Sequence, residues 1–512
     1  MKRIKKIFSM ALALTMLLAL SVTASAAGTG GETVGTTIST KVTGHTYEVY
    51  QIFTGDYHKA ADGTKHLSNL KWGKNGKPEE ETVQVGAPVS EQVLADLETV
   101  KDSTDKQKLG VIQKYANLTN EDNAYGEVTS VKPLTGVPAG YYLIKDLDNS
   151  QSGAADKTNT AYTLYVVQVV GEPELEITAK SDIPKVEKKV QDVNDSEANS
   201  TTEWQDSADY DIGDEVPFQL TATIGDRYND YNAYKLVFHD TLSQGLTFKQ
   251  NSVVVKVNGA EINENLYTVN TDIKDTCSFE VVFDDLKQIT QVTSGSKITV
   301  EYNATLNENA VIGAAGNPNT VYLEYSNNPN DATGNEIGRT PEDTVIVFTY
   351  EFEVNKKDEN GSSLAGAAFK LEKKVKSGET EKWELVKEFT VDGNNSATTF
   401  TFKGLDDGTY RLTETKTPAG YNTIEPIVFT ISADHVVEAT DPTLTDLTVA
   451  VENKAAQITA TAARGKLTTN VVNKKGATLP ETGGIGTTVF YVVGAILVLG
   501  SAVLLITRKR MR

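Results

Sequence analysis

Short runs in which apolar and polar residues alternate recur through most of the chain. They are rich in Val, Thr, Tyr and Ile, and clusters of Asn, Asp and Gly separate them. An alternation of period two places every second side chain on one face of a β-strand, and the polar clusters are typical of turns. The pattern predicts a mainly β chain with three tandem immunoglobulin-like β-sandwich domains.

One stretch near the N-terminus breaks this alternation. Val93, Leu94 and Leu97 recur at helical spacing after Ser90, which is a suitable N-cap. A second short helix is predicted over residues 107–115. The first domain is therefore expected to be a sandwich with helical insertions.

Linkers and turn signals divide the chain, most clearly where residues 181–184 read Ser-Asp-Ile-Pro. The length between the two ends is enough for about three domains of ordinary size. We predict a signal peptide at 1–27, an N-terminal domain at 28–180, a middle β-sandwich at 181–344, a third domain at 345–475 and a C-terminal segment at 476–512.

The N-terminal end has the order of an export signal. The basic residues Lys2 and Arg3 precede an apolar run at 10–22, and small residues follow at 24–27. This order predicts a secretory signal peptide that is removed after export. A membrane anchor is the weaker interpretation, because the apolar run is too short to span a bilayer well.

The C-terminal end combines a pentapeptide, an apolar segment and a basic tail. The apolar segment at 489–506 is long enough to cross roughly 30 Å of hydrocarbon as a helix. The basic residues at 508–512 would remain in the cytoplasm. The pentapeptide before them consists of Leu479, Pro480, Glu481, Thr482 and Gly483.

This combination resembles the LPXTG cell-wall sorting signal of Gram-positive surface proteins. The resemblance implies that a sortase cysteine attacks the Thr482 carbonyl, releases the chain from Gly483 onward and passes the Thr482 acyl group to an amine. Residues 474–478 are the whole spacer before the signal. A spacer this short favours a subunit displayed by polymerisation over a protein fixed singly to the wall.

Charge and cysteine content narrow the classes of partner. The net charge of −20 argues against nucleic acid or an anionic membrane surface as a partner. The chain has one cysteine, Cys277, and so cannot form an internal disulfide, although exported proteins often use disulfides for stability. We therefore look for another covalent cross-link, and we predict no cofactor and no metal.

Three strands of the third domain carry one polar residue each on an apolar face. Burial would lower the pKa of a lysine and raise that of a carboxyl. A neutral amine could then attack an asparagine carboxamide while the acid shuttles the proton, and ammonia would leave. The strands alternate through Phe352, Val354 and Lys356, through Tyr410, Leu412 and Glu414, and through Leu467, Thr469, Val471 and Asn473.

These segments resemble the collagen-adhesin B-type (CnaB) domain that Gram-positive pilins use, and residues 410–421 are similar to the pilin E-box. The resemblance implies that Lys356 is the amine, Glu414 the catalytic acid and Asn473 the acceptor of a Lys–Asn isopeptide bond. Asn453 is an alternative acceptor, because the residues at 447–453 alternate equally well.

The middle domain repeats this arrangement with weaker motifs. It resembles the middle domain of three-domain backbone pilins, which implies Lys188 as the amine, Asp240 as the promoting acid and Asn319 as the acceptor. Lys189 and Asn327 are the alternatives. The strands alternate through Val186, Lys188 and Val190, through Leu236, Phe238 and Asp240, and through Asn319, Val321, Leu323 and Tyr325.

A single lysine near the end of the first domain is a candidate for the linkage between subunits. Backbone pilins have a motif of the form Val-Tyr-Pro-Lys there, and residues 177–180 read Ile-Thr-Ala-Lys. The hydrophobic residue and the lysine are kept, whereas Tyr and Pro are not. The resemblance implies that the Lys180 amine joins Thr482 of the next subunit, and Lys185 is the competing lysine.

The resemblance as a whole implies a shaft subunit of a sortase-assembled pilus on a Gram-positive surface. Its bond-forming residues act once on their own chain, so the protein would not be an enzyme. The implied partners are pilus-specific and housekeeping sortases, other copies of the chain, tip and basal pilins, peptidoglycan, and host or extracellular-matrix ligands. The alternative is a monomeric wall-anchored adhesin without polymerisation. A surface glycosidase would need two carboxylates converging in a cleft, which strand alternation does not offer.

Overall fold

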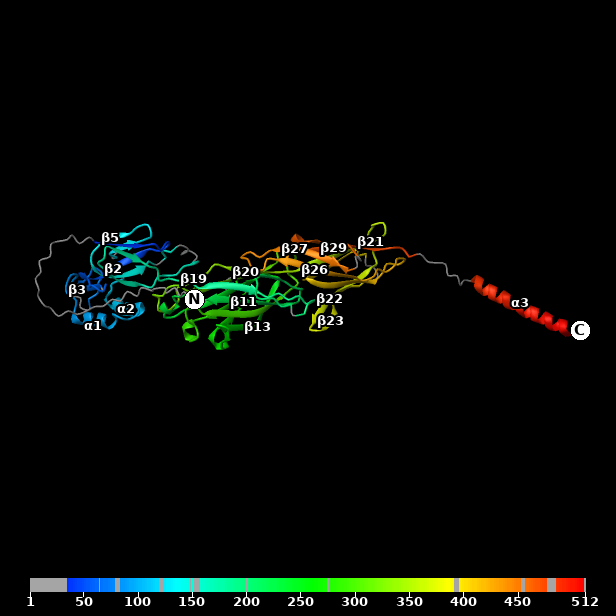
Figure 1. The fold of residues 1–512 in the computed structure, drawn as a ribbon, viewed down its shortest axis with the longest axis horizontal. Coiled ribbons are helices and arrows are strands. Elements are labelled where there is room, and N and C mark those ends of the chain that lie inside the picture. Colours follow the sequence, from blue (N-terminus) through cyan, green and yellow to red (C-terminus); the bar gives the residue numbers. More distant parts are fainter. Residues whose placement is uncertain are drawn as a thin grey trace, which may run out of the picture.

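In the computed structural model of the chain, three β-rich domains follow one another along the long axis in sequence order (Figure 1). The prediction of a mainly β chain is confirmed. The structure describes residues 35–476 and 485–510, except for 64, 79–82, 119–123, 148, 152–156, 199, 274–275, 391–395 and 453–455. The predicted signal peptide, the pentapeptide at 479–483 and Asn453 lie outside the described residues.

The first domain contains a smaller and a larger β-sheet, with helices beside the larger one. Its sheets have the orders β5-β1-β8 and β3-β2-β6-β7, and β4 pairs with β2. The elements are β1 (Thr36–Thr40), β2 (Tyr47–Lys59), β3 (Lys65–Trp72), α1 (Glu91–Thr99), α2 (Asp105–Ile112), η1 (Gln113–Tyr115), β4 (Gly126–Val128), β5 (Leu134–Val137), β6 (Gly140–Asp146), β7 (Val166–Val170) and β8 (Glu174–Ile177).

The helical insertions of the first domain are present as predicted. Ser90 caps α1 by accepting a hydrogen bond from the Val93 amide, and the apolar face of the helix is buried. The second helix begins at Asp105, two residues before the predicted start at 107. A capping box between Thr104 and Gln107 fixes this earlier start.

The middle domain is a sandwich of two large sheets. Their orders are β10-β20-β18-β12-β16-β15, with β19 paired to β18, and β14-β13-β17-β11-β9. The elements are β9 (Lys185–Val190), β10 (Ser207–Asp209), β11 (Glu215–Thr223), η3 (Tyr228–Asp230), β12 (Leu236–Leu242), β13 (Leu246–Val257), β14 (Ala260–Glu261), η4 (Glu264–Leu266), β15 (Thr268–Asn270), β16 (Phe279–Phe283), η5 (Leu286–Gln288), β17 (Lys297–Leu306), β18 (Asn317–Ser326), β19 (Ile337–Arg339) and β20 (Asp343–Phe348).

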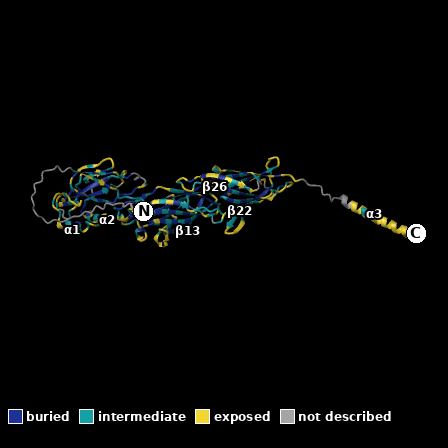
Figure 2. Cartoon of the chain, in the orientation of Figure 1, coloured by how far each residue is buried: buried dark blue, intermediate teal, exposed yellow. Residues whose placement is uncertain are grey.

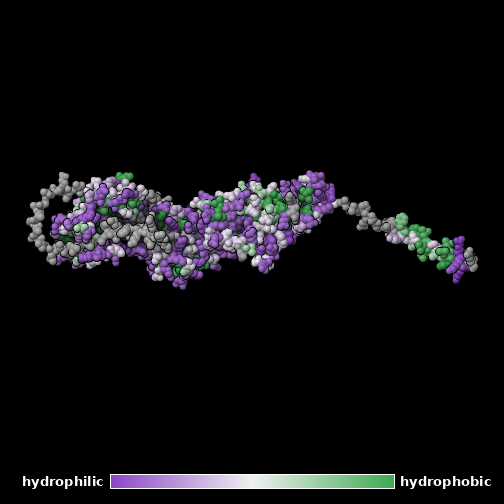
Figure 3. Space-filling model, viewed as in Figure 1, coloured by the Kyte–Doolittle hydropathy of each residue, from purple (hydrophilic) through white to green (hydrophobic). Residues whose placement is uncertain are grey.

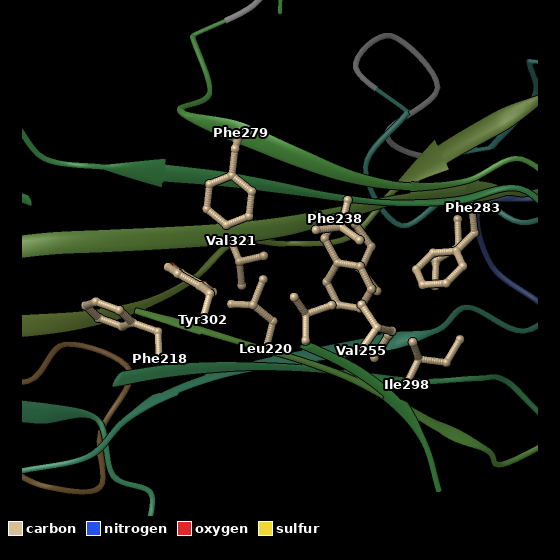
Figure 4. Packing of buried hydrophobic residues seen from close by; sticks show 14 of the residues in the cluster. Phe218, Leu220, Phe238, Val255, Phe279, Phe283, Ile298, Tyr302 and Val321 are labelled. Atoms are coloured by element: carbon tan, nitrogen blue, oxygen red, sulfur yellow. The ribbon is translucent and has the colours of Figure 1, made fainter. Parts of the chain in front are cut away.

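A single hydrophobic core fills the space between these two sheets. Phe218 and Tyr302 come from one sheet, Phe279 and Val321 come from the other, and their side chains point toward one another (Figure 4). Every second residue of β11, β17 and β18 faces inward, as the alternation predicts. Polar residues placed on these inward faces are therefore held against apolar neighbours.

The third domain is also a two-sheet sandwich. Its sheets have the orders β24-β21-β29-β28 and β23-β22-β25-β26-β27, and β21 pairs in parallel with β29. Only Thr349 separates β20 of the middle domain from β21. The elements are β21 (Tyr350–Asp358), β22 (Ala368–Ser377), β23 (Thr380–Phe389), β24 (Thr399–Leu405), β25 (Gly408–Lys416), β26 (Ile427–His435), β27 (Leu444–Val451), β28 (Ile458–Thr461), η7 (Ala462–Arg464) and β29 (Lys466–Asn473).

The C-terminal helix differs from the sandwiches in burial and hydropathy. Buried residues line the sheets of the three domains, whereas α3 (Ile485–Arg510) is exposed over most of its drawn length (Figure 2). Its surface is apolar and ends in basic residues (Figure 3). Residues Val489–Arg510 are long and apolar enough to cross a membrane, which agrees with the predicted segment at 489–506.

Candidate functional site

The middle domain brings Lys188, Asp240 and Asn319 together inside its core. Lys188 lies on β9 of one sheet, whereas Asp240 and Asn319 lie on the neighbouring strands β12 and β18 of the other. All three residues are completely buried. The inward alternation of each strand places the three side chains on the facing surfaces of the two sheets.

A tyrosine that sequence analysis did not single out connects this triad. The Lys188 ammonium group donates to Asp240 Oδ2 and, over 3.2 Å, to the Tyr302 hydroxyl. Tyr302 donates to Asp240 Oδ2 at 3.1 Å, and Asn319 Nδ2 donates to the Tyr302 oxygen at 2.7 Å. Asp240 Oδ1 and Asn319 Oδ1 have no hydrogen-bond partner among the described residues.

The surroundings of the triad favour its uncharged forms. Burial lowers the pKa of the Lys188 amine, and the nearby Asp240 charge only partly offsets this effect. Burial likewise raises the pKa of the Asp240 carboxyl against the opposing influence of Lys188. The aromatic rings of Phe218 and Tyr302 each lie 5.7 Å from the Lys188 nitrogen. A neutral amine next to a protonated acid is the state that can attack a carboxamide.

The third domain assembles Lys356, Glu414 and Asn473 at one end of its sandwich. Lys356 and Asn473 lie on the paired parallel strands β21 and β29, where Lys356 is opposite Val471. Glu414 lies on β25 of the other sheet. Lys356 and Asn473 are completely buried, and Glu414 is 5% exposed.

In this second triad the acid contacts the amide directly. Asn473 Nδ2 donates to Glu414 Oε1 at 3.1 Å and to Oε2 at 2.9 Å. The Glu414 carboxylate is held in place by Thr417 Oγ1 at 3.3 Å and by the Ile424 amide at 3.2 Å. Lys356 Nζ donates to the Val471 carbonyl at 3.3 Å. Burial lowers the pKa of Lys356, and the charge of Glu414 opposes that shift.

The alternatives in the middle domain lie away from its triad. Lys189 points to the opposite side of β9 and forms an ion pair with Asp206 at 2.6 Å. The Asn327 side chain donates to Thr160 Oγ1 of the first domain at 2.9 Å. The structure brings neither residue to Asp240.

The two candidate linkage lysines differ in exposure. The Lys180 carbonyl accepts a hydrogen bond from the Leu164 amide, which ties this residue to the first domain. Its side chain is 21% exposed and forms an ion pair with Asp105 of α2. Lys185 begins β9 and is exposed. Lys180 therefore has to leave Asp105 before its amine can act as a nucleophile.

A cluster of acidic residues lies at the joint between the middle and third domains. The third-domain residue Lys373 contacts Asp211 and Asp406, each at 2.6 Å, and Asp195 at 3.3 Å. These carboxylates raise the pKa of Lys373, in contrast to the two triad lysines. Two groups in this cluster are close enough to hold a cation, namely Asp192, Asp209 and His435, and Asp195, Asp211, Asp214 and Asp406.

The fold and these sites define a class of protein. Sandwiches with buried Lys–acid–Asn triads precede an apolar helix with a basic end, and the sequence between them carries the LPXTG pattern. This is the organisation of a wall-anchored surface protein of Gram-positive bacteria.

Known families match three parts of the chain. Residues 212–329 match the family described as Gram-positive pilin backbone subunit 2, Cna-B-like domain. Residues 350–443 match the prealbumin-like fold domain, and residues 471–511 match the LPXTG cell wall anchor motif. The chain is thus a Gram-positive backbone pilin with an LPXTG anchor, and it is located in a wall-anchored pilus on the cell surface. The anchor motif implies that the chain is a sortase substrate, and the pilin-backbone match implies that it polymerises with other pilins.

Individual proteins of known sequence or structure are also similar to this chain. The trypsin-resistant surface T6 protein of Streptococcus pyogenes serotype M6 is 25% identical over 401 residues, which cover 65% of this chain and 70% of that protein. The solved structure of the T6 backbone pilin of Streptococcus pyogenes serotype M6 has a TM-score of 0.50 at 19% identity, and the match covers 86% of this chain and 98% of that chain. The full-length major pilin SpaD from Corynebacterium diphtheriae has a TM-score of 0.48 at 18% identity and covers 86% of this chain and 98% of its own.

Proposed function

We propose that this backbone pilin forms the shaft of its pilus through two kinds of isopeptide bond. The Lys180 amine of one subunit joins the Thr482 carbonyl of the next. Within each subunit, Lys188 joins Asn319 and Lys356 joins Asn473. The observation that carries the proposal is the burial of each lysine beside an acid and an asparagine in a sandwich core.

The reaction that forms each internal isopeptide bond needs no cofactor. The neutral lysine amine attacks the carboxamide carbon, a C–N bond forms, and the original C–N bond of the carboxamide breaks. Asp240 or Glu414 gives a proton to the departing nitrogen and takes the one that the attacking amine loses. One ammonia leaves for each bond, so the acids act once on their own chain and do not turn over.

The linkage between subunits requires sortases and other pilins. A pilus-specific sortase would transfer Thr482 to Lys180, and a housekeeping sortase would transfer the last subunit to peptidoglycan. Tip and basal pilins would end the fibre, and host or extracellular-matrix ligands would be contacted along it. With the domain boundaries that we predict at 180, 344 and 475, the linkage lysine would lie at the junction of the first two domains.

The linkage is tested by an immunoblot of wall material boiled in detergent. Cells would express the wild type, Lys180→Ala, Lys185→Ala, or Lys41→Ala as an exposed control lysine in the first domain. We expect a ladder of very large species that collapses to monomer only in Lys180→Ala. Collapse only in Lys185→Ala would move the linkage to that residue. A monomer in every strain, with a pilus sortase present, would refute the shaft and leave a singly anchored adhesin.

A further inference from the structure

The Tyr302 hydroxyl contacts all three members of the middle-domain triad. It lies 3.2 Å from Lys188 Nζ, 3.1 Å from Asp240 Oδ2 and 2.7 Å from Asn319 Nδ2. A phenolic hydroxyl has one hydrogen to donate and two lone pairs to accept with. Tyr302 donates to Asp240 and accepts from the other two residues, so its hydrogen-bonding capacity is used entirely within the triad.

The acids of the two triads reach their asparagines differently. Glu414 contacts Asn473 Nδ2 directly with both carboxylate oxygens. Asp240 is one methylene shorter, and the hydrogen bond from Asn319 Nδ2 goes to Tyr302 and not to the acid. The hydroxyl thus occupies the gap between the acid and the nitrogen that must leave as ammonia.

We propose that Tyr302 is a catalytic residue of the middle domain, which relays a proton from the Asp240 carboxyl to Asn319 Nδ2. This inference rests on the Lys188–Asn319 bond proposed above. The neutral Lys188 amine attacks Asn319 Cγ while Asp240 carries a proton. As the old C–N bond breaks, Tyr302 gives its proton to Nδ2 and receives the one that Asp240 carries, and Asp240 takes the proton that the attacking nitrogen loses. Ammonia leaves, and both Tyr302 and Asp240 return to their starting protonation states.

The surroundings of Tyr302 suit a relay that ends with the hydroxyl unchanged. Its ring is fixed by Phe218, Phe248 and Phe279, whose ring centroids lie 5.4, 5.5 and 4.9 Å from its own. Burial and the nearby Asp240 charge raise the pKa of the Tyr302 hydroxyl well above its usual value. The phenolate is therefore disfavoured, and loss of one proton must be coupled to gain of another.

The test measures both internal bonds in the same molecule. The full chain is made in a cell-free system that contains detergent and no sortase. Samples are quenched in denaturant at intervals, digested, and analysed by mass spectrometry for cross-linked peptides that have lost one ammonia. In Tyr302→Phe we expect the Lys188–Asn319 bond to form about 100-fold more slowly, which is within the usual range for a general acid. The Lys356–Asn473 bond, whose acid needs no relay, should keep its wild-type rate.

A matched variant separates the hydroxyl from general effects on packing. Tyr234 is another tyrosine buried in the same core. Tyr234→Phe should form both bonds at the wild-type rates. Adding Asp240→Glu to Tyr302→Phe should restore part of the lost rate, because the longer acid reaches toward the amide as Glu414 does. A merely structural defect would not be repaired in this way.

The solvent deuterium isotope effect on the wild-type chain tests the relay even if Tyr302→Phe does not fold. Protonation of the leaving nitrogen moves two protons through the relay in the middle domain, and only one proton in the third domain. In heavy water the wild-type rate of the Lys188–Asn319 bond should therefore fall more than that of the Lys356–Asn473 bond. Equal slowing, or a Tyr302→Phe chain that forms the middle-domain bond at the wild-type rate, would overturn the relay. A wild-type chain that never loses ammonia in its middle domain would instead refute the proposed bond itself.

Discussion

Replacing Glu414 with glutamine should stop the third-domain cross-link while leaving the shape of the site in place. Glutamine has the size of glutamate, and its carbonyl can still accept from Thr417 and the Ile424 amide. It cannot take up the Lys356 proton or return one to Asn473. The folded domain should therefore retain a free lysine and a free asparagine.

The loss of stability depends on the number of residues in the loop that the isopeptide bond closes. Between Lys356 and Asn473 this loop is slightly longer than 100 residues, and a cross-link around such a loop stabilises a protein by about 4–5 kcal/mol through the unfolded state. For a domain of this size, 1 kcal/mol corresponds to roughly 3–4 °C in melting temperature. We expect the third domain of Glu414→Gln to melt about 15 °C lower than that of the wild type.

Calorimetry of the full chain in detergent would measure this shift, with mass spectrometry to count the ammonia lost. Glu388→Gln, at an exposed strand position of the same domain, is the matched control and should melt like the wild type. A Glu414→Gln chain that lacks the bond but melts with the wild type would show that the loop-closure reasoning is wrong. A chain that still loses both ammonia molecules would show that Glu414 is not the acid.

Three further predictions concern the joint between the middle and third domains. Burial raises the pKa of Asp407 to about 7 and of Asp214 to about 6, and acidic neighbours raise the pKa of His435 to about 10. Each folded pKa exceeds its unfolded value, so the joint should become less stable as pH rises from about 5 to about 9, and calorimetry would measure this loss. Lys373→Met leaves its carboxylates without a cation and should cost about 3–5 kcal/mol in denaturant unfolding, whereas exposed Lys382→Met should cost almost nothing. Gly404→Ala adds a Cβ at φ +75°, 2.5 Å from Ile212, and should speed amide exchange across the joint; unchanged exchange would contradict this close fit.

Alternation alone was enough to place the triad residues on inward faces. Lys188, Asp240 and Asn319 each share a strand face with apolar residues at every second position, and a strand has no other way to arrange them. The structure adds which inward residues meet. It puts Asn473 next to Glu414, whereas Asn453, which alternates equally well, lies outside the described residues.

Two features could not be predicted from one-dimensional pattern. Tyr302 alternates like any core aromatic residue, and its function depends on which residues the opposite sheet places near its hydroxyl. The contacts of Lys373 depend on how two domains dock, because Asp211 lies more than 150 residues away in the chain. Several aspartates stand between residues 192 and 211, but no period or spacing links them to a lysine in another domain.

The parallel pairing of β21 with β29 decides how a pull would pass through the third domain. Tension arriving through Thr349 enters β21, and the anchor side of the chain leaves just after β29. With Lys356 bonded to Asn473, the force would cross between these neighbouring strands and bypass everything between them. That bypassed length could otherwise extend by roughly 400 Å per subunit. A shaft built this way would keep its length and transmit a sudden load to the wall, where a chain of unbonded sandwiches would lengthen and absorb it.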